Sequence, residues 1–324
     1  MASGQHFRPP GPLGFGGAPL GNMFQAISDD QAHATLEAAW DAGYRYFDTA
    51  PHYGSGLSEH RFGEMLRTKP RDDFVLSTKA GRLLEPVRTP PESIFKNPLP
   101  FEGCYDYSAD GVLRSVEDSY QRLGLSQIDI VYIHDIAADH HGDAWTDQFA
   151  IAMEGAKALT RLREEGVIKA WGLGVNLVEP CLRALEQADP DVFLLAGRYS
   201  LLDLGGLDDL FPACLDRGVS VVVGGPFNSG LLAGGTTFDY AEAPDEKVEA
   251  RQRLQAIAVE HGVDLRAAAL QFCAAHPAVS AVIPGTKSAE RARDNMELVR
   301  TPVPEAFWET LRAQGVLPEH APTP

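Results

Sequence analysis

The chain lacks the features that mark secreted and membrane-spanning proteins. It has four cysteines in 324 residues, Cys104, Cys181, Cys214 and Cys273, and their wide spacing argues against a disulfide framework or a zinc template. It has no run of about 20 apolar residues that would span a membrane. It also has no charged start followed by an apolar stretch, as a secretory signal would have. We therefore expect a cytoplasmic protein with reduced thiols.

Basic residues are scarce as well. The chain has 28 Lys and Arg against 45 Asp and Glu, so its formal net charge is −17. Nucleic acids and anionic membranes bind clustered Lys and Arg, so neither is an expected partner. Residues 1–12 show no regular pattern and predict a loose tail. No heptad or apolar surface stripe indicates an oligomeric state.

Short β-rich runs alternate with longer helical segments. Several runs are almost continuously apolar (FVLST, IDIVYIH, VSVVVGG), which is typical of parallel strands buried on both faces. The predicted strands are Leu13–Gly17, Arg45–Asp48, Phe74–Thr78, Ile128–His134, Ala170–Val175, Val192–Leu195, Val219–Val223 and Val279–Ile283. Eight strand–helix units predict a (β/α)8 barrel formed by one domain over residues 1–324.

Capping signals delimit several helices. Ser28 precedes two acidic residues, and Gly43 ends that helix; Ser108 and Gly124 bound another in the same way. Further helices are predicted over Asp147–Glu165, over Pro244–His261 and after Ser288. A doubly wound open sheet is the alternative fold, but Gly14-Phe-Gly16-Gly17 lacks the G-x-G-x-x-G spacing of its nucleotide loop.

Two long loops follow predicted strands. Arg82–Tyr107 contains five prolines, and Phe227–Asp245 begins with FNSGLLAGG. Loops of this length are usually functional or disordered. Both would emerge at the C-terminal face of the barrel, where active sites of this fold lie.

Four polar residues fall at or just beyond the ends of consecutive strands. Asp48, Lys79 and His134 end the second, third and fourth strands, and Tyr53 follows Asp48 by five residues. An ammonium beside a phenol should lower its pKa, and a carboxylate would hold the ammonium in place. A histidine on the same rim can orient a substrate oxygen. This set suits proton transfer at a carbonyl or alcohol oxygen.

Taken singly, these residues have plainer interpretations. Asp48 can cap a turn, Tyr53 can be a packed aromatic, and His134 can be a satisfied strand-end histidine. Their joint placement favours a catalytic set. We expect no metal site, because the neighbouring histidines in the loop after His134 lack the spacing of zinc ligands.

The sequence resembles the aldo-keto reductase superfamily over nearly its whole length. The resemblance rests on GYRYFDTAPHYGSGLSE, TKAG, the HD after the fourth strand, GVIKAWGLGVN and IPGTKSAERARDN, in that order. It implies a (β/α)8 barrel that interconverts carbonyls and alcohols with NADP or NAD. It also implies that Tyr53 is the general acid/base, tuned by Lys79, that Asp48 is the partner of Lys79, and that His134 orients the substrate.

The resemblance further implies a set of cofactor contacts. Asn176 matches a contact to the nicotinamide carboxamide. The family's loop over the cofactor pyrophosphate corresponds here to Phe227, Asn228, Ser229 and Leu231. Its contacts to the adenosine end of the cofactor correspond to Ser288, Arg291 and Asn295.

Three positions depart from the common pattern of the superfamily. Ala196 replaces a carboxamide-binding glutamine, with Arg198 nearby as a substitute. Gly224 replaces a tyrosine that stacks on the nicotinamide. Gly285 replaces a lysine that clamps the 2′-phosphate, but Lys287 and Arg291 can neutralise that phosphate, so NADP is slightly favoured over NAD.

Within the superfamily, LGFGGAPLGNMF, STKAGRLLEP and VVVGGPFNSGLLAGG most resemble bacterial L-fucose or D-threo-aldose 1-dehydrogenases. That resemblance implies oxidation of an anomeric hydroxyl to a lactone. Candidate contacts to the small-molecule substrate are His52, Tyr105, Tyr107 and Trp145. The alternatives are a general aldehyde or ketone reductase, a pyridoxal 4-dehydrogenase, a nucleotide-sensing regulatory subunit, and a lyase that uses Lys79 as a Schiff-base nucleophile.

Overall fold

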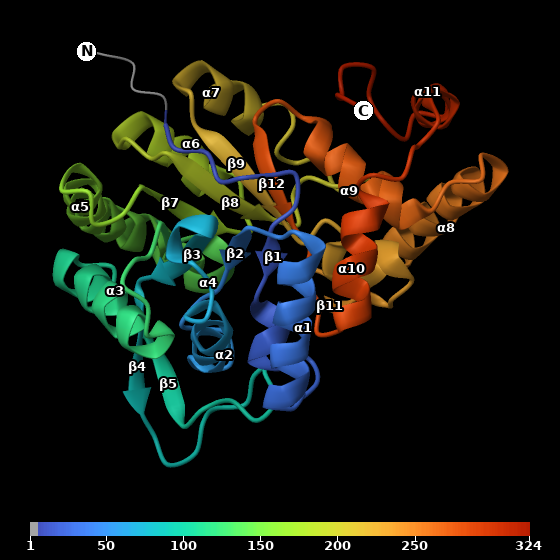
Figure 1. Cartoon of the computed structure of the whole chain (residues 1–324). Coiled ribbons are helices and arrows are strands. Elements are labelled where there is room, and N and C mark those ends of the chain that lie inside the picture. Colours follow the sequence, from blue (N-terminus) through green and yellow to red (C-terminus); the bar gives the residue numbers. More distant parts are fainter. Residues whose placement is uncertain (1–5) are drawn as a thin grey trace.

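A computed structural model of the chain describes residues 6–324 and contains a parallel eight-stranded barrel (Figure 1). The strands are hydrogen-bonded in the order β1-β2-β3-β6-β7-β8-β9-β12. Parallel bridges Leu13–Val282 and Gly16–Gly285 join the first strand to the last and close the sheet. The predicted (β/α)8 barrel is therefore confirmed, and the open doubly wound sheet is excluded.

The barrel strands match the predicted runs closely. Their bounds are β1 Phe15–Gly16, β2 Tyr46–Asp48, β3 Val75–Ala80, β6 Ile130–His134, β7 Ala170–Val175, β8 Val192–Ala196, β9 Ser220–Gly224 and β12 Val279–Ile283. Most observed ends lie within two residues of the predicted ones, because each apolar run is a strand buried on both faces.

Helices surround the barrel (Figure 1). Their bounds are α1 Asp29–Ala42, α2 Leu57–Leu66, α3 Ala109–Leu123, α4 Ala138–His141, α5 Trp145–Glu164, α6 Glu179–Gln187, α7 Leu210–Arg217, α8 Asp245–Glu260, α9 Leu265–Ala275, α10 Ala289–Leu298 and α11 Glu305–Ala313. The predicted caps of α1 are confirmed: Ser28 accepts a hydrogen bond from the N–H of Gln31, and Gly43 adopts a left-handed φ of 101°. Among the described residues, no helix is both long enough and apolar enough to cross a bilayer.

Both long loops contain short hairpins that the sequence did not reveal. The first contains β4 (Arg82–Pro86) paired antiparallel with β5 (Phe101–Tyr105). The second contains the 3-10 turn η4 (Asn228–Ala233) and the hairpin of β10 (Thr237–Phe238) with β11 (Ala241–Glu242). The loops are therefore structured extensions of the barrel.

The prediction of a loose tail over residues 1–12 is wrong for residues 6–12, which the structure describes. Residues 1–5 lie outside the described residues, but the imidazole Nδ1 of His6 lies 2.9 Å from the carboxylate of Asp191. Arg8 donates hydrogen bonds of 3.2 Å to the carbonyls of Pro277 and Val279. Short-range sequence pattern could not show these contacts, because their partners lie more than 180 residues away.

The barrel interior explains how the site is positioned. Side chains alternate along a strand, so Tyr46 and Asp48 of β2 point to the same side, as do Tyr132 and His134 of β6. Tyr46 and Tyr132 belong to the apolar cluster inside the barrel. The next inward residues, Asp48 and His134, therefore lie one layer above this cluster, at the C-terminal mouth.

The packing of β7 against β8 depends on Gly172. A Cβ atom at residue 172 would lie 1.7 Å from the carbonyl oxygen of Val192, which is backbone and cannot move aside cheaply. We expect Gly172→Ala to lower the free energy of unfolding by about 2 kcal/mol or more, measured by urea denaturation. Gly103→Ala is the matched control, since a Cβ there meets nothing within 4 Å. Equal stability of the two variants would contradict this packing.

Candidate active site

A buried ion pair lies at the mouth of the barrel. The Lys79 ammonium is 2.8 Å from Asp48 Oδ2 and donates a second hydrogen bond, also of 2.8 Å, to the carbonyl of Thr49. Ser77 donates to Asp48 Oδ1 at 2.6 Å. Both charged side chains are 1% exposed. Burial raises the pKa of Asp48, although Lys79 and Ser77 favour its ionised form.

Tyr53 lies directly above this pair. The Lys79 ammonium is 4.7 Å from the centre of its ring. The Tyr53 hydroxyl has no hydrogen-bond partner within residues 6–324, and it is not among the buried polar atoms that lack a partner, so it is open to solvent. It can therefore exchange a proton with a bound molecule.

The expected lowering of the pKa of Tyr53 is wrong for the protein alone. Burial raises that pKa well above its usual value, and the carboxylates of Asp48 and Asp135 raise it further. The physical reason is that burial disfavours the charged phenolate, and the Lys79 ammonium, which faces the ring beside Asp48, does not outweigh this burial. Tyr53 is consequently a neutral phenol at physiological pH.

The ring of Tyr53 belongs to a cluster of four rings. The ring of His134 lies 6.0 Å from that of Tyr53 and 6.1 Å from that of His52. Phe95 lies 6.0 Å from Tyr53 and 5.2 Å from His52. The structure thus brings His52 into the site and adds Phe95, which sequence reasoning missed because it lies inside a proline-rich loop. A bridge to Met23 fixes that loop.

His134 is a neutral imidazole. Burial, followed by the charges of Lys79 and Arg82, lowers its pKa well below the usual value. Its Nδ1 is buried and has no partner among residues 6–324, while Nε2 lies 3.5 Å from Asp135 Oδ1. The carboxylate favours a proton on Nε2, so this nitrogen is the donor that the ring can offer to an oxygen in the site.

Two charged residues at the rim were also missed. Arg82, the first residue of β4, forms a buried ion pair with Asp135, and its Nη1 lies 3.1 Å from His52 Nδ1. The Tyr105 ring covers its guanidinium at 4.5 Å. Arg82 follows Lys79 by three residues in TKAGR, and Asp135 directly follows His134 in HD. This closeness to predicted catalytic residues was the signal in the sequence that could have identified them.

The other substrate candidates lie in different surroundings. Tyr105 is 38% exposed and stacks on Tyr107 at 5.7 Å. Tyr107 is 1% exposed, and its hydroxyl donates to the carbonyl of His134 at 2.8 Å, so it supports the end of β6. Trp145 begins α5, and its ring contacts Phe149 and the guanidinium of Arg183 instead of the four rings.

Arg198 is fully engaged within the protein. It donates to the carbonyl of Asn176 at 2.9 Å and pairs with Asp203 at 2.9 Å and with Asp239 at 2.6 Å. It therefore joins the end of β7 to the turn of the β10–β11 hairpin. The side chain of Asn176 donates to Asp139 at 3.1 Å.

Asn228 and Ser229 hold the loop after β9 in shape. Both residues adopt left-handed backbone conformations, with φ of 45° and 55°. The Asn228 amide donates to the carbonyl of Gly197 at 3.3 Å, and Ser229 Oγ accepts from the N–H of Tyr240 at 2.9 Å. Leu231 is buried in the core, and Phe227 packs partly against it.

The start of α10 gathers positive charge. Ser288 caps the helix by accepting from the N–H of Arg291 at 3.3 Å. Burial, and next the charge of Arg291, lower the pKa of Lys287, so these two cations lie close together. Asn295 is buried on the same helix. Two positive charges beside a helix N-terminus favour the binding of an anionic group.

Gly285 is fixed by close packing. A Cβ atom there would lie 2.9 Å from the ring of Pro19 and 3.2 Å from the carbonyl oxygen of Gly16. The bridge between Gly16 and Gly285 also closes the barrel. This packing leaves little room for a side chain at residue 285.

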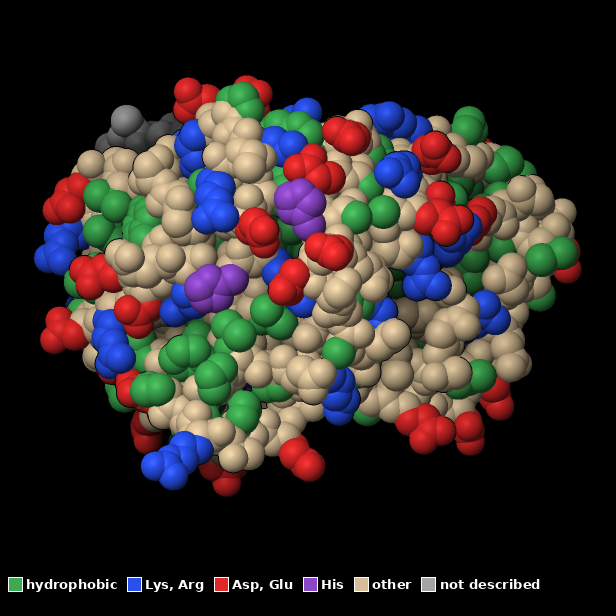
Figure 2. Space-filling model, turned by 60° about the horizontal axis from the view of Figure 1, so that its bottom comes forward, with side chains coloured by type: hydrophobic (Ala, Val, Ile, Leu, Met, Phe, Trp, Pro, Cys, Tyr) green, Lys and Arg blue, Asp and Glu red, His purple; other side chains and the backbone are tan. Residues whose placement is uncertain are grey.

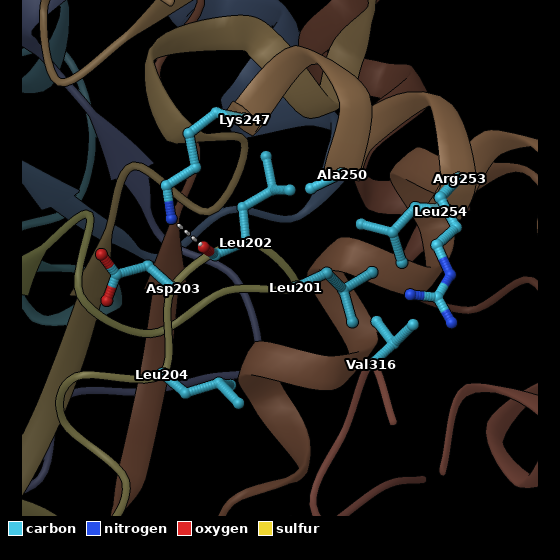
Figure 3. Close-up of a pocket in the computed structure, with 9 residues that line it drawn as sticks. All are labelled: Leu201, Leu202, Asp203, Leu204, Lys247, Ala250, Arg253, Leu254 and Val316. Atoms are coloured by element: carbon cyan, nitrogen blue, oxygen red, sulfur yellow. Dashed lines mark hydrogen bonds between the residues drawn. The ribbon is translucent and has the colours of Figure 1, made fainter. Parts of the chain in front are cut away.

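A separate hollow of about 510 Å³ lies between α8, the Leu201–Leu204 loop and the segment after α11 (Figure 3). Lys247 at its edge donates to the carbonyl of Leu202 at 2.9 Å. The hollow contains none of the predicted catalytic residues, but Asp203 in its wall holds Arg198.

Charge is dispersed over the surface. On the face that Figure 2 presents, acidic and basic side chains are interspersed without a continuous field of Lys and Arg among the described residues. Residues 6–324 also contain no cluster of three His, Cys, Asp or Glu side chains suited to a metal ion.

Comparisons with known proteins agree with this geometry. The model of the aldo/keto reductase family matches residues 12–314. The chain is 45% identical to pyridoxal 4-dehydrogenase of Microbacterium luteolum and 41% identical to D-threo-aldose 1-dehydrogenase of a Pseudomonas species, in each case over 94% of both chains. An aldo-keto reductase from Bacillus halodurans, solved in its holo form, superposes with a TM-score of 0.71 at 25% identity, covering 98% of this chain and 99% of the other. The chain belongs to the aldo/keto reductase family and is an oxidoreductase.

Proposed function

We propose that this enzyme uses NADP or NAD to oxidise the anomeric hydroxyl of an aldose, of the L-fucose or D-threo-aldose type, to a lactone. The observation that carries the proposal is the open Tyr53 hydroxyl, set between the neutral ring of His134 and the buried Lys79–Asp48 pair. The relative named D-threo-aldose 1-dehydrogenase supports an aldose as the substrate. The four cysteines are free, which supports the proposed cytoplasmic location.

The residues present fit a nicotinamide dinucleotide. The cations Lys287 and Arg291 at the start of α10 would hold a phosphate at the adenosine end, with Ser288 and Asn295 beside them. The Phe227–Leu231 loop would cover the pyrophosphate, and Asn176 would meet the carboxamide. The two cations favour the 2′-phosphate of NADP. Arg198, which already pairs with two carboxylates, acts in our proposal by holding the loop that carries Asn176.

Each catalytic residue has a separate task in the proposed reaction. The Tyr53 oxygen accepts the proton of the anomeric hydroxyl, and His134 donates a hydrogen bond from Nε2 to the same substrate oxygen as its double bond to carbon forms. Lys79, fixed by Asp48, favours the phenolate that begins this transfer. When bound, the nicotinamide supplies the acceptor for the hydride that leaves C1.

Pyridoxal is the second candidate substrate. The relative named pyridoxal 4-dehydrogenase and the aromatic wall formed by Phe95, His52 and Tyr53 favour it. Pyridoxal and aldoses share a relevant chemistry, since the aldehyde of each closes on a hydroxyl to form a cyclic hemiacetal. The complete set of four catalytic residues argues against a purely nucleotide-sensing subunit.

A substrate panel with both cofactors separates these activities. We expect L-fucose or D-arabinose to reduce NADP⁺ or NAD⁺ with a kcat/KM at least about tenfold above that of pyridoxal. Initial rates of NADPH or NADH formation measure this. A preference for pyridoxal would select the second candidate. If neither sugar reduces cofactor while simple aldehydes consume NADPH, the aldose proposal is wrong and the enzyme is a general reductase.

The raised pKa of Tyr53 predicts opposite pH dependences for the two directions. Oxidation needs the phenolate, whose fraction grows as pH rises toward a raised pKa, so kcat/KM should increase between about pH 6 and pH 9. Reduction needs the phenol, which predominates over the same range, so its rate should stay level or fall. Initial rates in both directions test this, and an oxidation rate that falls with pH would contradict the assignment of Tyr53 as the base.

A further inference from the structure

The pairing of Arg82 with His52 determines where the imidazole carries its proton. The guanidinium Nη1 lies 3.1 Å from His52 Nδ1. A guanidinium has only donors, so Nδ1 must accept. A neutral imidazole has one N–H, which must then lie on Nε2.

Arg82 is held rigidly for this contact. Asp135 pairs with its other nitrogen, Nη2, and the side chains of Arg82 and Asp135 are only 11% and 8% exposed. The Tyr105 ring covers the guanidinium at 4.5 Å. Asp135 itself adopts a left-handed φ of 55°, a conformation that aspartate tolerates better than most other non-glycine residues.

The charges around His52 keep its ring neutral. Burial, then the charges of Arg82, His140 and Lys79, lower the pKa of His52 to about 3. The nearby anion, Asp135, is already paired with Arg82 and lies within 3.5 Å of His140 and His134. His52 is therefore uncharged near neutral pH.

The free nitrogen of His52 belongs to the four-ring site. Its Nε2 has no hydrogen-bond partner among the described residues. This atom is not one of the fully buried polar atoms that lack a partner, so it is accessible to solvent. The ring lies 6.1 Å from His134, which in turn lies 6.0 Å from Tyr53. A molecule bound at the Tyr53 hydroxyl would therefore lie beside a second neutral N–H donor.

We propose that Arg82 is a positioning residue that fixes His52 as the Nε2–H tautomer, and that His52 thereby donates a hydrogen bond to an oxygen on the substrate carbon next to the reacting carbon. The substrate class is thus an aldehyde or hemiacetal with a neighbouring hydroxyl, as in an aldose. The assignment of that oxygen rests on the proposed function, whereas the tautomer of His52 does not.

Nitrogen NMR tests the tautomer without any substrate. The full chain is labelled with ¹⁵N at its ten histidines, and His52→Gln assigns the signal of residue 52. In the native protein we expect the Nε2–H pattern, unchanged between about pH 5 and pH 8. In Arg82→Met the signal should lose the single tautomer and show a mixture of the Nε2–H and Nδ1–H forms. An Nδ1–H pattern in the native protein, or no change in Arg82→Met, would overturn the proposal.

Matched variants guard against loss of folding. Arg82→Met leaves Asp135 without its partner, so Arg82→Met/Asp135→Asn removes both charges together, and circular dichroism checks its fold. Arg82→Lys keeps a donor-only cation and should restore the Nε2–H pattern. If Arg82→Lys behaves like Arg82→Met, Arg82 acts only through packing and the positioning role is wrong.

Kinetics test the substrate contact separately. The amide of Gln can reach the position of Nε2, whereas that of Asn reaches only the position of Nδ1. We expect His52→Asn to raise KM for the accepted aldose about 5- to 10-fold, with a smaller effect on kcat, and His52→Gln to keep most of the affinity. KM for an aldehyde without the neighbouring hydroxyl should be the same in both variants. Equal KM for the aldose would overturn the contact while leaving the tautomer and the proposed reaction standing.

Discussion

The buried pair of Lys79 and Asp48 is the interaction on which the site depends. Removing two charges from water is costly, and apolar residues of similar size would stabilise the barrel as well or better. The pair is nevertheless 1% exposed, and further hydrogen bonds support it from Ser77 to Asp48 and from Lys79 to the carbonyl of Thr49. In the proposed reaction the pair serves catalysis, because it holds an ammonium 4.7 Å from the centre of the Tyr53 ring.

The groups around this pair are kept neutral by burial. His134 and His52 have lowered pKa values and Tyr53 has a raised one, so the pocket contains two imidazoles and a phenol without charge. Neutral donors can orient a substrate oxygen and still leave the proton transfer to one group. The Arg82–Asp135 pair at the rim has a related effect, because Arg82 fixes the position of the proton on the His52 imidazole and leaves that ring neutral.

The sequence was enough to predict the barrel and the gathering of Asp48, Tyr53, Lys79 and His134 at its mouth, because both follow from local pattern. Apolar runs such as IDIVYIH mark buried strands, and a polar residue at the end of each run must lie at the rim. Contacts between distant loops could not be read in this way. Phe95, Arg82 and Asp135 join the site through the folding of the 82–107 loop, whose prolines and exposed polar residues concealed the β4–β5 hairpin. The lowered pKa expected for Tyr53 failed because sequence gives proximity but not burial.

The central claim is that Tyr53 transfers the proton while the rest of the site binds and orients. Tyr53→Phe removes only the hydroxyl and keeps the ring that packs against Phe95 and His134. The most direct test compares turnover of the accepted substrate with cofactor affinity, measured by fluorescence titration. The account predicts that turnover falls by about a thousandfold or more while the cofactor Kd changes by less than about threefold. Near-normal turnover in Tyr53→Phe would contradict it.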